Sequence, residues 1–337
     1  MERVRLGFIG CGSMAGGQGR RIVMDVPDAE IVALADPNSQ NLAAFTSSVF
    51  GDGKRPEQTF ADHTEMLKSV ELDGVVIVSP HNLHYQQSVD ALNAGRHVLV
   101  QKPMVIRTED AQSLIALAEE KQKVLSVAFP GPFTKEFMYI RDVIERGELG
   151  DIYLVTGVCA QNWMELNAGT WRTVQEIAGG GNLYDSGAHM FNAMLYLTGL
   201  AATKVFAFVD NKGHEVDMTA AVSIQLTKGA LGSAVVSGDS PKFEQGIYIQ
   251  GTQGSIKCSI YGGGEVLHWR GKDLMDDPPL PDAVPMEQNF VDVIRGKAVT
   301  PSPPLLGLRQ ARLMDAIYES ARTGQVVNVV ADEEASN

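Results

Sequence analysis

The chain has 337 residues, of which 44% are hydrophobic and 20% are charged, and a chain of this length exceeds what one hydrophobic core usually supports, so we expect two domains. The 41 Asp and Glu outnumber the 28 Lys and Arg, which gives a formal net charge of -13. Since the basic residues form no cluster along the sequence, nucleic acid and anionic membranes are not expected as partners.

The cysteines Cys11, Cys159 and Cys258 lie far apart and form no CxxC pair. They are predicted to be reduced thiols, as in cytoplasmic proteins. No stretch approaches the roughly 20 apolar residues that a membrane helix needs, so we expect a cytoplasmic protein. A metal site is not predicted, because no metal-ligand spacing is found among the scattered histidines His81, His84, His97 and His189.

The first part of the chain alternates short β-like runs with longer segments of helical period. Strands are expected at 4–9, 30–35, 74–79, 97–100 and 124–127. Capping residues and apolar spacing predict helices over 82–94 and 108–121. This alternation is typical of a buried parallel sheet covered by helices, and it predicts an α/β Rossmann domain over residues 1–129.

The pattern changes after Phe129-Pro130-Gly131-Pro132. Helices are expected up to Arg146, near 182–197, and over 286–295 and 308–323. The β-like runs are 152–161, 204–209, 219–226, 231–238, 246–251, 254–260 and 265–269, most of them joined by glycine-bearing turns. They predict an α+β second domain over residues 130–337 with a large, mainly antiparallel open sheet. The last helix, 308–323, is a candidate for packing back toward the first domain.

A glycine-rich turn follows the first predicted strand, in the order Gly10-Cys11-Gly12-Ser13-Met14-Ala15. In this G-x-G-x-x-A pattern Gly10 permits a tight turn, Gly12 lets the backbone approach a pyrophosphate, and small Ala15 allows close helix–strand packing. Asp36 ends the second predicted strand, where a carboxylate accepts hydrogen bonds from an adenosine ribose. Because no Lys or Arg close to Asp36 in sequence could neutralise a 2′-phosphate, we predict NAD in preference to NADP. A tight turn with a solvated aspartate is the alternative.

Two further groups of residues could carry chemistry. Gln101-Lys102-Pro103 ends a predicted strand, at the carboxyl edge where open α/β sheets bind ligands, and Pro103 restricts Lys102 to an extended conformation. Gly179-Gly180-Gly181, which would allow close approach of the backbone to a ligand, precedes a predicted helix in which Asp185 and His189 stand four residues apart on one face. Taken alone, Lys102 could be a surface lysine and the pair a structural hydrogen bond.

These motifs together resemble the Gfo/Idh/MocA oxidoreductase family, which includes inositol and sugar dehydrogenases. They are the G-x-G-x-x-A turn, SPHNLHYQQSVDALNAGRHVLVQKP at 79–103, Trp171-Arg172, and GGGNLYDSGAH at 179–189. The resemblance implies that Lys102, Asp185 and His189 are catalytic. The cofactor residues that we expect are Gly10, Gly12, Ser13, Met14, Asp36, Ser79, Pro80, Asn82, His84, Gln101, Lys102, Trp171 and Arg172. The family motif is usually E-K-P, whereas this chain has Gln101, which can form hydrogen bonds but carries no charge.

Around a hydroxyl-rich substrate we expect Lys102, Gln161, Asn162, Trp163, Arg172, Tyr184, Asp185 and His189. The resemblance implies an NAD(P)-dependent dehydrogenase that transfers hydride between the nicotinamide and a secondary alcohol or ketone of a sugar, inositol or related polyol. As a hypothesis, His189 accepts the hydroxyl proton, Lys102 stabilises the developing negative charge, and Asp185 orients the imidazole or binds a neighbouring hydroxyl. Lys102 could transfer the proton instead.

Two other functions are compatible with this resemblance: a glycosidase that retains its NAD, and a non-catalytic regulator that senses NAD or a sugar. We also expect a homodimer or homotetramer formed through the second-domain sheet. The apolar runs 205–209 and 220–226 would lie on its outer face and be buried against another subunit.

Overall fold

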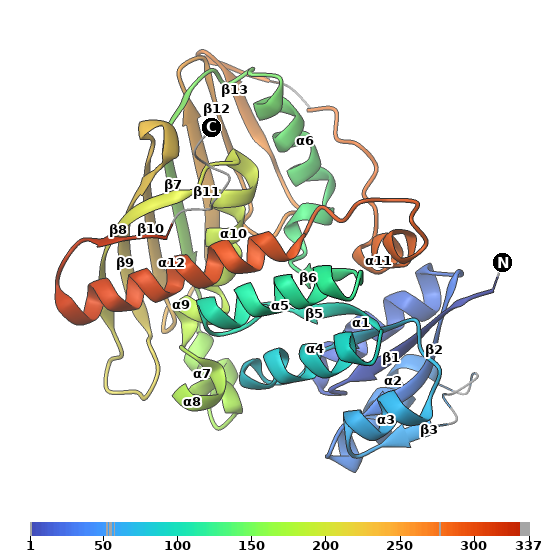
Figure 1. Ribbon diagram of the computed structural model, residues 1–337. Coiled ribbons are helices and arrows are strands. Elements are labelled where there is room, and N and C mark those ends of the chain that lie inside the picture. Colours follow the sequence, from blue (N-terminus) through green and yellow to red (C-terminus); the bar gives the residue numbers. More distant parts are fainter. Residues whose placement is uncertain (1, 52, 54–55, 57, 276–277, 331–337) are drawn as a thin grey trace. The chain divides into compact units, whose positions relative to one another are not determined.

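The computed structural model describes residues 2–51, 53, 56, 58–275 and 278–330. The chain forms two compact units (Figure 1). The first comprises the described residues up to Val105, with Glu109–Ala128 and Val284–Gly307. The second comprises Ile106–Thr108, Phe129–Ala283 and the described residues from Leu308 onward.

The first unit is built on a parallel sheet with the strand order β3-β2-β1-β4-β5-β6. Its strands are β1 (Val4–Ile9), β2 (Ala29–Ala35), β3 (Gln58–Phe60), β4 (Gly74–Ile77), β5 (His97–Gln101) and β6 (Leu125–Ala128). Its helices include α1 (Ser13–Asp25), α2 (Ser39–Phe50), α3 (His63–Ser69), α4 (His84–Asn93) and α5 (Thr108–Glu120). The predicted Rossmann sheet is confirmed. The order reverses between β1 and β4, and ligands bind at the carboxyl ends of the strands at such a point.

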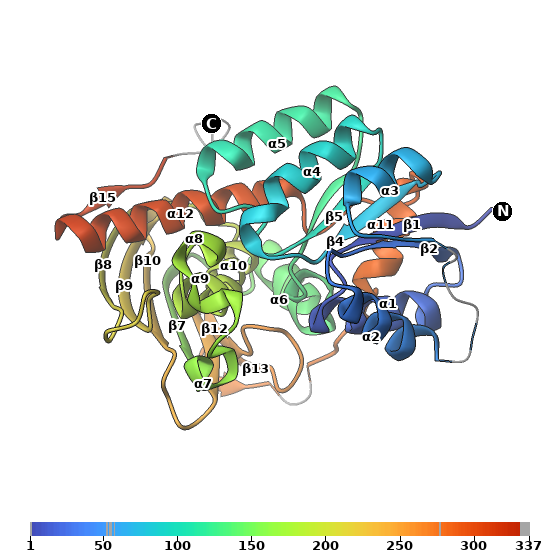
Figure 2. The ribbon, with the colours of Figure 1, turned by 90° about the horizontal axis from the view of Figure 1, so that it is seen from below.

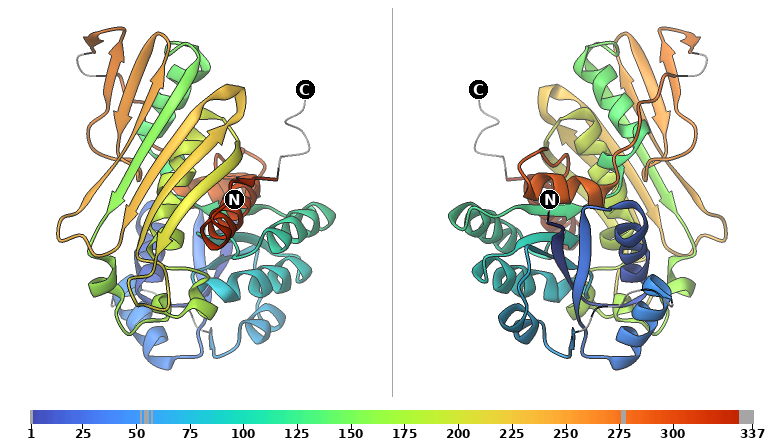
Figure 3. Two further views of the ribbon diagram at one scale, coloured as in Figure 1. Left: turned by 90° about the vertical axis from the view of Figure 1, so that its left-hand side faces the viewer. Right: turned by 90° about the vertical axis from the view of Figure 1, so that its right-hand side faces the viewer.

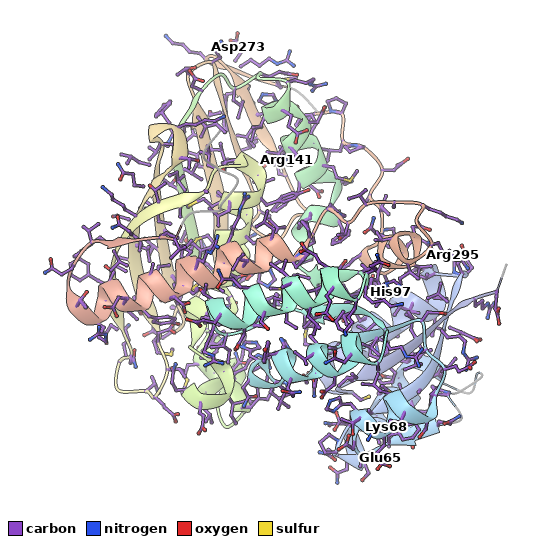
Figure 4. The ribbon with its side chains drawn as sticks, in the orientation of Figure 1. Glu65, Lys68, His97, Arg141, Asp273 and Arg295 are labelled. Atoms are coloured by element: carbon purple, nitrogen blue, oxygen red, sulfur yellow. The ribbon has the colours of Figure 1, made fainter. Side chains whose placement is uncertain are left out.

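Residues 284–307 pack with the first unit, although the expected boundaries assigned them to the second domain. Helix α11 (Met286–Ile294) brings Phe290 and Ile294 against Gly74 at the start of β4, where a Cβ would lie 3.3 Å from both. Buried Glu287 pairs with Arg21 of α1 at 2.7 Å. Arg295, labelled in Figure 4, lies 2.8 Å from Asp28. Apolar packing and these ion pairs explain why the segment returns to this unit.

The second unit contains a sheet with the order β14-β13-β12-β11-β7-β10-β9-β8-β15. Its strands are β7 (Ile152–Ala160), β8 (Ala202–Asp210), β9 (Thr219–Leu226), β10 (Leu231–Ser237), β11 (Glu244–Gly251), β12 (Gly254–Cys258), β13 (Leu267–Arg270), β14 (Asp273–Leu274) and β15 (Val327–Asn328). The pair β7–β10 is parallel, whereas the other ladders of this sheet are antiparallel. The predicted, mainly antiparallel sheet is therefore confirmed.

Helices cover one face of this sheet (Figure 3). The longer ones are α6 (Lys135–Glu145), α10 (Gly187–Thr198) and α12 (Pro304–Thr323), and their apolar side chains share a core with the strands. Helix α12 begins at Pro304, four residues before the expected start, because proline is well suited to the first turn of a helix. No helix in the described part of the chain is both long and apolar enough to cross a membrane.

The outer face of the second sheet is less apolar along β9 than the sequence predicted. Along β9, Ala220, Val222, Ile224 and Leu226 turn into the core, and the exposed residues between them are small or polar. Val205 of β8 is also buried. The run 220–226 therefore does not supply an apolar outer face, because alternate residues of a strand point to opposite faces, whereas Phe208 of the run 205–209 is exposed as expected.

Three short helices of the second unit lie close together near one end of its sheet (Figure 2). They are α7 (Trp163–Asn167), α8 (Gln175–Ala178) and α9 (Asn182–Asp185). The segment between α7 and α8 forms the single 3-10 turn η3 (Trp171–Thr173). These elements carry four of the residues that the sequence placed around a substrate, which are Trp163, Arg172, Tyr184 and Asp185.

Candidate active site

The turn between β1 and α1 contains Gly10 and Gly12, and each position favours glycine for a different physical reason. Gly10 has φ +86°, and a Cβ there would lie 2.6 Å from the carbonyl oxygen of Val78, so the protein's own backbone requires glycine. A Cβ on Gly12 would meet no described atom within 4 Å. The missing side chain of Gly12 therefore leaves open space at the N-terminus of α1, as a pyrophosphate bound to helix N–H groups requires. Ser13 and Met14 open the helix, and buried Ala15 lets it pack closely.

Asp36 stands beside this turn and holds it. Its Oδ2 accepts a hydrogen bond from the backbone N–H of Cys11 at 2.8 Å, and its Oδ1 accepts one from Asn38 at 2.8 Å. The Asn41 amide lies 3.2 Å from both oxygens. A carboxylate at the end of β2, fixed next to the glycine turn, fits the ribose-binding position. Burial, followed by the charge of Asp36, raises the pKa of the Cys11 thiol to about 12, so this cysteine is not a thiolate at neutral pH.

His84 bridges the segment that follows β4 and the segment that follows β5, because its ring contacts both. This imidazole is fully buried, with Nδ1 2.8 Å from the carbonyl oxygen of Pro103 and Nε2 2.9 Å from that of Ser79. Burial lowers the pKa of His84, against the opposing effect of the two carbonyls. Both ring nitrogens contact the protein itself, so His84 braces the neighbourhood of Lys102. Asn82 is exposed one turn earlier, after Pro80.

Lys102 follows β5 directly, and its peptide bond to Pro103 is cis. The preceding Gln101 donates from Nε2 to Oε1 of Gln18 at 3.0 Å, and Gln18 is buried in α1. Gln101 and Gln18 therefore form an uncharged pair of amides. The glutamate that is usual at position 101 would instead place a carboxylate against this buried part of α1.

In the second unit, a buried carboxylate holds the glycine turn that precedes Asp185. Oδ2 of Asp217 accepts hydrogen bonds from the Gly181 N–H at 2.5 Å and the Tyr318 hydroxyl at 2.6 Å, while Oδ1 accepts one from Leu183 N–H at 2.7 Å. Burial raises the pKa of Asp217, and these hydrogen bonds oppose the increase. Asp217 thus caps the first turn of α9 from a distant part of the sequence.

Packing within the second unit explains why three glycines stand in this turn. An added Cβ would lie 2.8 Å from the Ile106 side chain at Gly179, 2.1 Å from the Tyr318 hydroxyl at Gly180, and 2.0 Å from the Asp217 carbonyl oxygen at Gly181. The close approach of the backbone to Ile106, Tyr318 and Asp217 therefore accounts for all three glycines by itself.

Asp185 and His189 lie on either side of a helix break. Helix α9 ends at Asp185 and α10 begins at Gly187, so the single helix expected over 182–197 is interrupted at Ser186. Oδ2 of Asp185 accepts a hydrogen bond from Trp163 Nε1 at 2.9 Å and lies 3.4 Å from Nε of Arg172. The Arg172 guanidinium stands 4.5 Å from the centre of the Trp171 ring. Two side chains therefore fix the Asp185 carboxylate.

Several expected substrate residues have structural partners. Trp163 is only 2% exposed, so it has almost no surface that a substrate could contact. It holds Asp185 through the hydrogen bond from its Nε1. The hydroxyl of buried Tyr184 donates to the Ile106 carbonyl at 2.8 Å, and Gln161 donates to the Asn182 amide oxygen at 3.0 Å. Asn162 is partly exposed and donates to Glu165. Among the residues that the structure describes, no group of three or more His, Cys, Asp or Glu is placed to hold a metal ion.

Both units match models of one protein family. Residues 4–129 match the "Oxidoreductase family, NAD-binding Rossmann fold", and residues 137–257 match the "GFO/IDH/MocA C-terminal domain". The chain belongs to the Gfo/Idh/MocA oxidoreductase family. Its first unit is the NAD-binding Rossmann domain of the family, and the chain is an NAD(P)-dependent dehydrogenase.

Similar members of the family act on sugars and inositol. The D-glucoside 3-dehydrogenase of Escherichia coli is 26% identical, with 97% of both chains aligned. The scyllo-inositol 2-dehydrogenase (NADP(+)) IolW of Bacillus subtilis is 28% identical over 80% of this chain and 75% of that protein. The solved WlbA dehydrogenase of Bordetella pertussis, in complex with NADH and UDP-GlcNAcA, has 25% identity and a TM-score of 0.86, over 98% of this chain and 100% of that one.

Three residues of the site were not predicted from the sequence. Asp217 and Tyr318 hold the glycine turn, and Tyr261 packs against His189. A weak signal existed for Asp217, since it is an acidic residue between the apolar Val216 and Met218. Tyr261 lies in a glycine-rich turn with no motif, and only the packing of distant segments brings it to the site.

Proposed function

We propose that the enzyme interconverts a secondary alcohol and the corresponding ketone of a cyclic sugar, inositol or related polyol, with NAD(H) in preference to NADP(H). The observation that carries this proposal is the presence of Lys102, Asp185 and His189 in a chain that matches the family over both units. A protein that only bound a ligand would have no chemical need for all three. The substrates in the names of the two curated relatives support the substrate class.

Each residue has a distinct part in the proposed reaction. When bound, the nicotinamide supplies the hydride acceptor or donor. Gly10, Gly12 and Asp36 would hold the adenosine and pyrophosphate portion. In the oxidative direction His189 accepts the hydroxyl proton, and Lys102 donates a hydrogen bond to the same oxygen and stabilises its negative charge. Asp185, fixed by Trp163 and Arg172, accepts a hydrogen bond from a neighbouring hydroxyl of the substrate.

The test of the activity is absorbance at 340 nm with NAD⁺ and a panel of inositols, aldoses and deoxysugars. Lys102→Ala is expected to lower kcat/KM at least about 100-fold, because an electrostatic donor to the reacting oxygen is lost. The matched control is Lys68→Ala, since Lys68 is an exposed lysine of α3 in the same unit (Figure 4). A silent panel, with NAD⁺ binding confirmed separately, would overturn the proposed oxidation.

Asp36 is expected to set the preference for NAD over NADP, because its carboxylate repels a 2′-phosphate. Asp36→Asn keeps an oxygen for the Cys11 N–H and removes only the charge. The ratio of kcat/KM for NAD⁺ to that for NADP⁺ should fall about tenfold, which corresponds to ~1.4 kcal/mol. Steady-state kinetics with both cofactors measures the ratio, and a wild type that favours NADP⁺ would contradict the assignment.

We also propose that the outer face of the second sheet joins subunits. Phe208, Leu231 and Val235 are exposed on this face, and such apolar patches are usually buried in assemblies. Sedimentation velocity at micromolar concentration is expected to show a dimer or tetramer. Val235→Glu should shift the population toward monomer, whereas a wild type that sediments as a monomer would contradict the proposed interface.

A further inference from the structure

Two aromatic side chains lie in series next to His189 within the second unit. The ring centre of Tyr261 is 4.7 Å from that of His189, and the two planes are tilted by 56°. The ring centre of Phe243 is 6.4 Å from that of Tyr261, and these planes differ by only 21°. The imidazole therefore stands at an angle to the Tyr261 ring, and the Phe243 ring lies nearly parallel to that of Tyr261.

Two nearly parallel rings form a wider apolar surface when one is displaced sideways from the other. Carbon atoms in contact are about 3.5–4.0 Å apart, so rings whose centres are 6.4 Å apart touch only if one is displaced sideways from the other. Such a pair presents a wider apolar surface than either ring alone. We call Tyr261 and Phe243 the aromatic platform.

The inner ring of the platform is fixed at both ends. The backbone N–H of Tyr261 donates to Ser259 Oγ at 3.1 Å, and its hydroxyl interacts with the side chain of Ser186, the residue between α9 and α10. The hydroxyl also lies 3.9 Å from Cys159 Sγ. Burial raises the pKa of Tyr261, so the hydroxyl stays protonated at neutral pH. The platform is thus tied to the segment that carries Asp185.

The outer ring is accessible. Phe243 stands directly before β11 and is 59% exposed, although exposing an aromatic side chain to water is unfavourable. It is continuous, through Tyr261, with the residue that we assign to proton transfer. Covering this exposed apolar surface with part of the substrate would remove it from water and so favour binding.

We propose that the aromatic platform receives the C–H face of a ring-shaped substrate and selects cyclic polyols over acyclic ones. A six-membered sugar or inositol ring with several equatorial hydroxyls presents C–H groups above and below its plane, while its hydroxyls point outward, toward groups such as His189 and Asp185. An acyclic polyol has no such face until its rotatable bonds are fixed, which costs conformational entropy. The inference rests on the proposed function for the position of the substrate.

The test measures binding separately from turnover. Isothermal titration calorimetry with the NADH-saturated enzyme uses three probes: myo-inositol, methyl α-D-glucoside and the acyclic polyol glucitol. Phe243→Ala is expected to weaken binding of the preferred cyclic probe about tenfold, and Phe243→Tyr, which keeps the ring face, about twofold or less. Binding of glucitol should change less than about twofold. The control is Leu274→Ala, which removes an exposed apolar side chain of β14 in the same unit and should leave binding unchanged.

The outcomes separate the platform from the proposed function. Where the preferred cyclic probe is turned over, Phe243→Ala should raise KM about tenfold and leave kcat within about threefold, because the ring binds ground state and transition state alike. If Phe243→Ala behaves like Leu274→Ala, or if no cyclic probe binds the wild type, the platform proposal is wrong. Phe243-dependent binding without turnover of any probe would instead contradict the proposed function and support the platform.

Discussion

Replacing Gly181 by alanine is expected to lower the free energy of unfolding of the second unit by about 2–3 kcal/mol and to reduce activity at least tenfold. The new Cβ would lie 2.0 Å from the backbone carbonyl oxygen of Asp217. Moving Asp217 away from the glycine turn would cost free energy, because the Asp217 carboxylate accepts hydrogen bonds from the N–H groups of Gly181 and Leu183. Any shift of this turn also moves Asp185, which follows it by one helical turn. Thermal unfolding by circular dichroism and the 340 nm assay measure the two effects.

Gly246→Ala is the matched control for this substitution. Gly246 is buried in β11 of the same unit, and its added Cβ would also face a carbonyl oxygen, that of Cys258, but at 3.4 Å. We expect the control to change stability by less than about 1 kcal/mol, since its Cβ makes a tolerable contact. Equal stability losses in the two variants would show that the tight approach between Gly181 and Asp217 is not the cause.

Replacing His189 by alanine is expected to lower kcat about 10²–10⁴-fold, the usual contribution of a general acid or base. The loss should be accompanied by unchanged NADH affinity, measured by fluorescence titration, because Gly10, Gly12 and Asp36, which are predicted to hold the adenosine and pyrophosphate portion, belong to the first unit, whereas His189 belongs to the second. Added imidazole should restore part of the activity, since a small base can replace the missing side chain.

His214→Ala provides the comparison, because His214 is an exposed histidine of the same unit. It should retain wild-type turnover, with no response to imidazole. Full turnover by His189→Ala would exclude His189 as the proton-transfer residue. In that case Lys102 becomes the candidate for the same step, and the loss of activity in Lys102→Ala should then depend on pH.

Some features of this protein follow from short segments of its sequence. The alternation of apolar runs with helical segments predicted the Rossmann sheet, and the glycine-bearing turns predicted the mainly antiparallel sheet. Gly10 was identified from its motif, because a tight turn with positive φ has a local requirement for glycine. The positions of Lys102, Asp185 and His189 were equally readable, since their motifs depend on neighbouring residues alone.

Other features depend on residues that are distant in sequence. Gly179, Gly180 and Gly181 were recognised as a motif, but their reason lies in Ile106, Tyr318 and Asp217, which approach them only in the folded protein. The break at Ser186 and the return of α11 to the first unit were likewise not predicted.

The sequence by itself determined the order and type of most elements and the motifs at their ends. The tertiary structure alone decided which unit receives α11, which carboxylate caps α9, and which aromatic rings stand beside His189. The physical reason is the distance along the chain over which each effect acts. Periodicity, capping and turn chemistry depend on a few neighbouring residues, whereas burial and hydrogen-bond pairing depend on residues that folding brings within a few ångströms of one another.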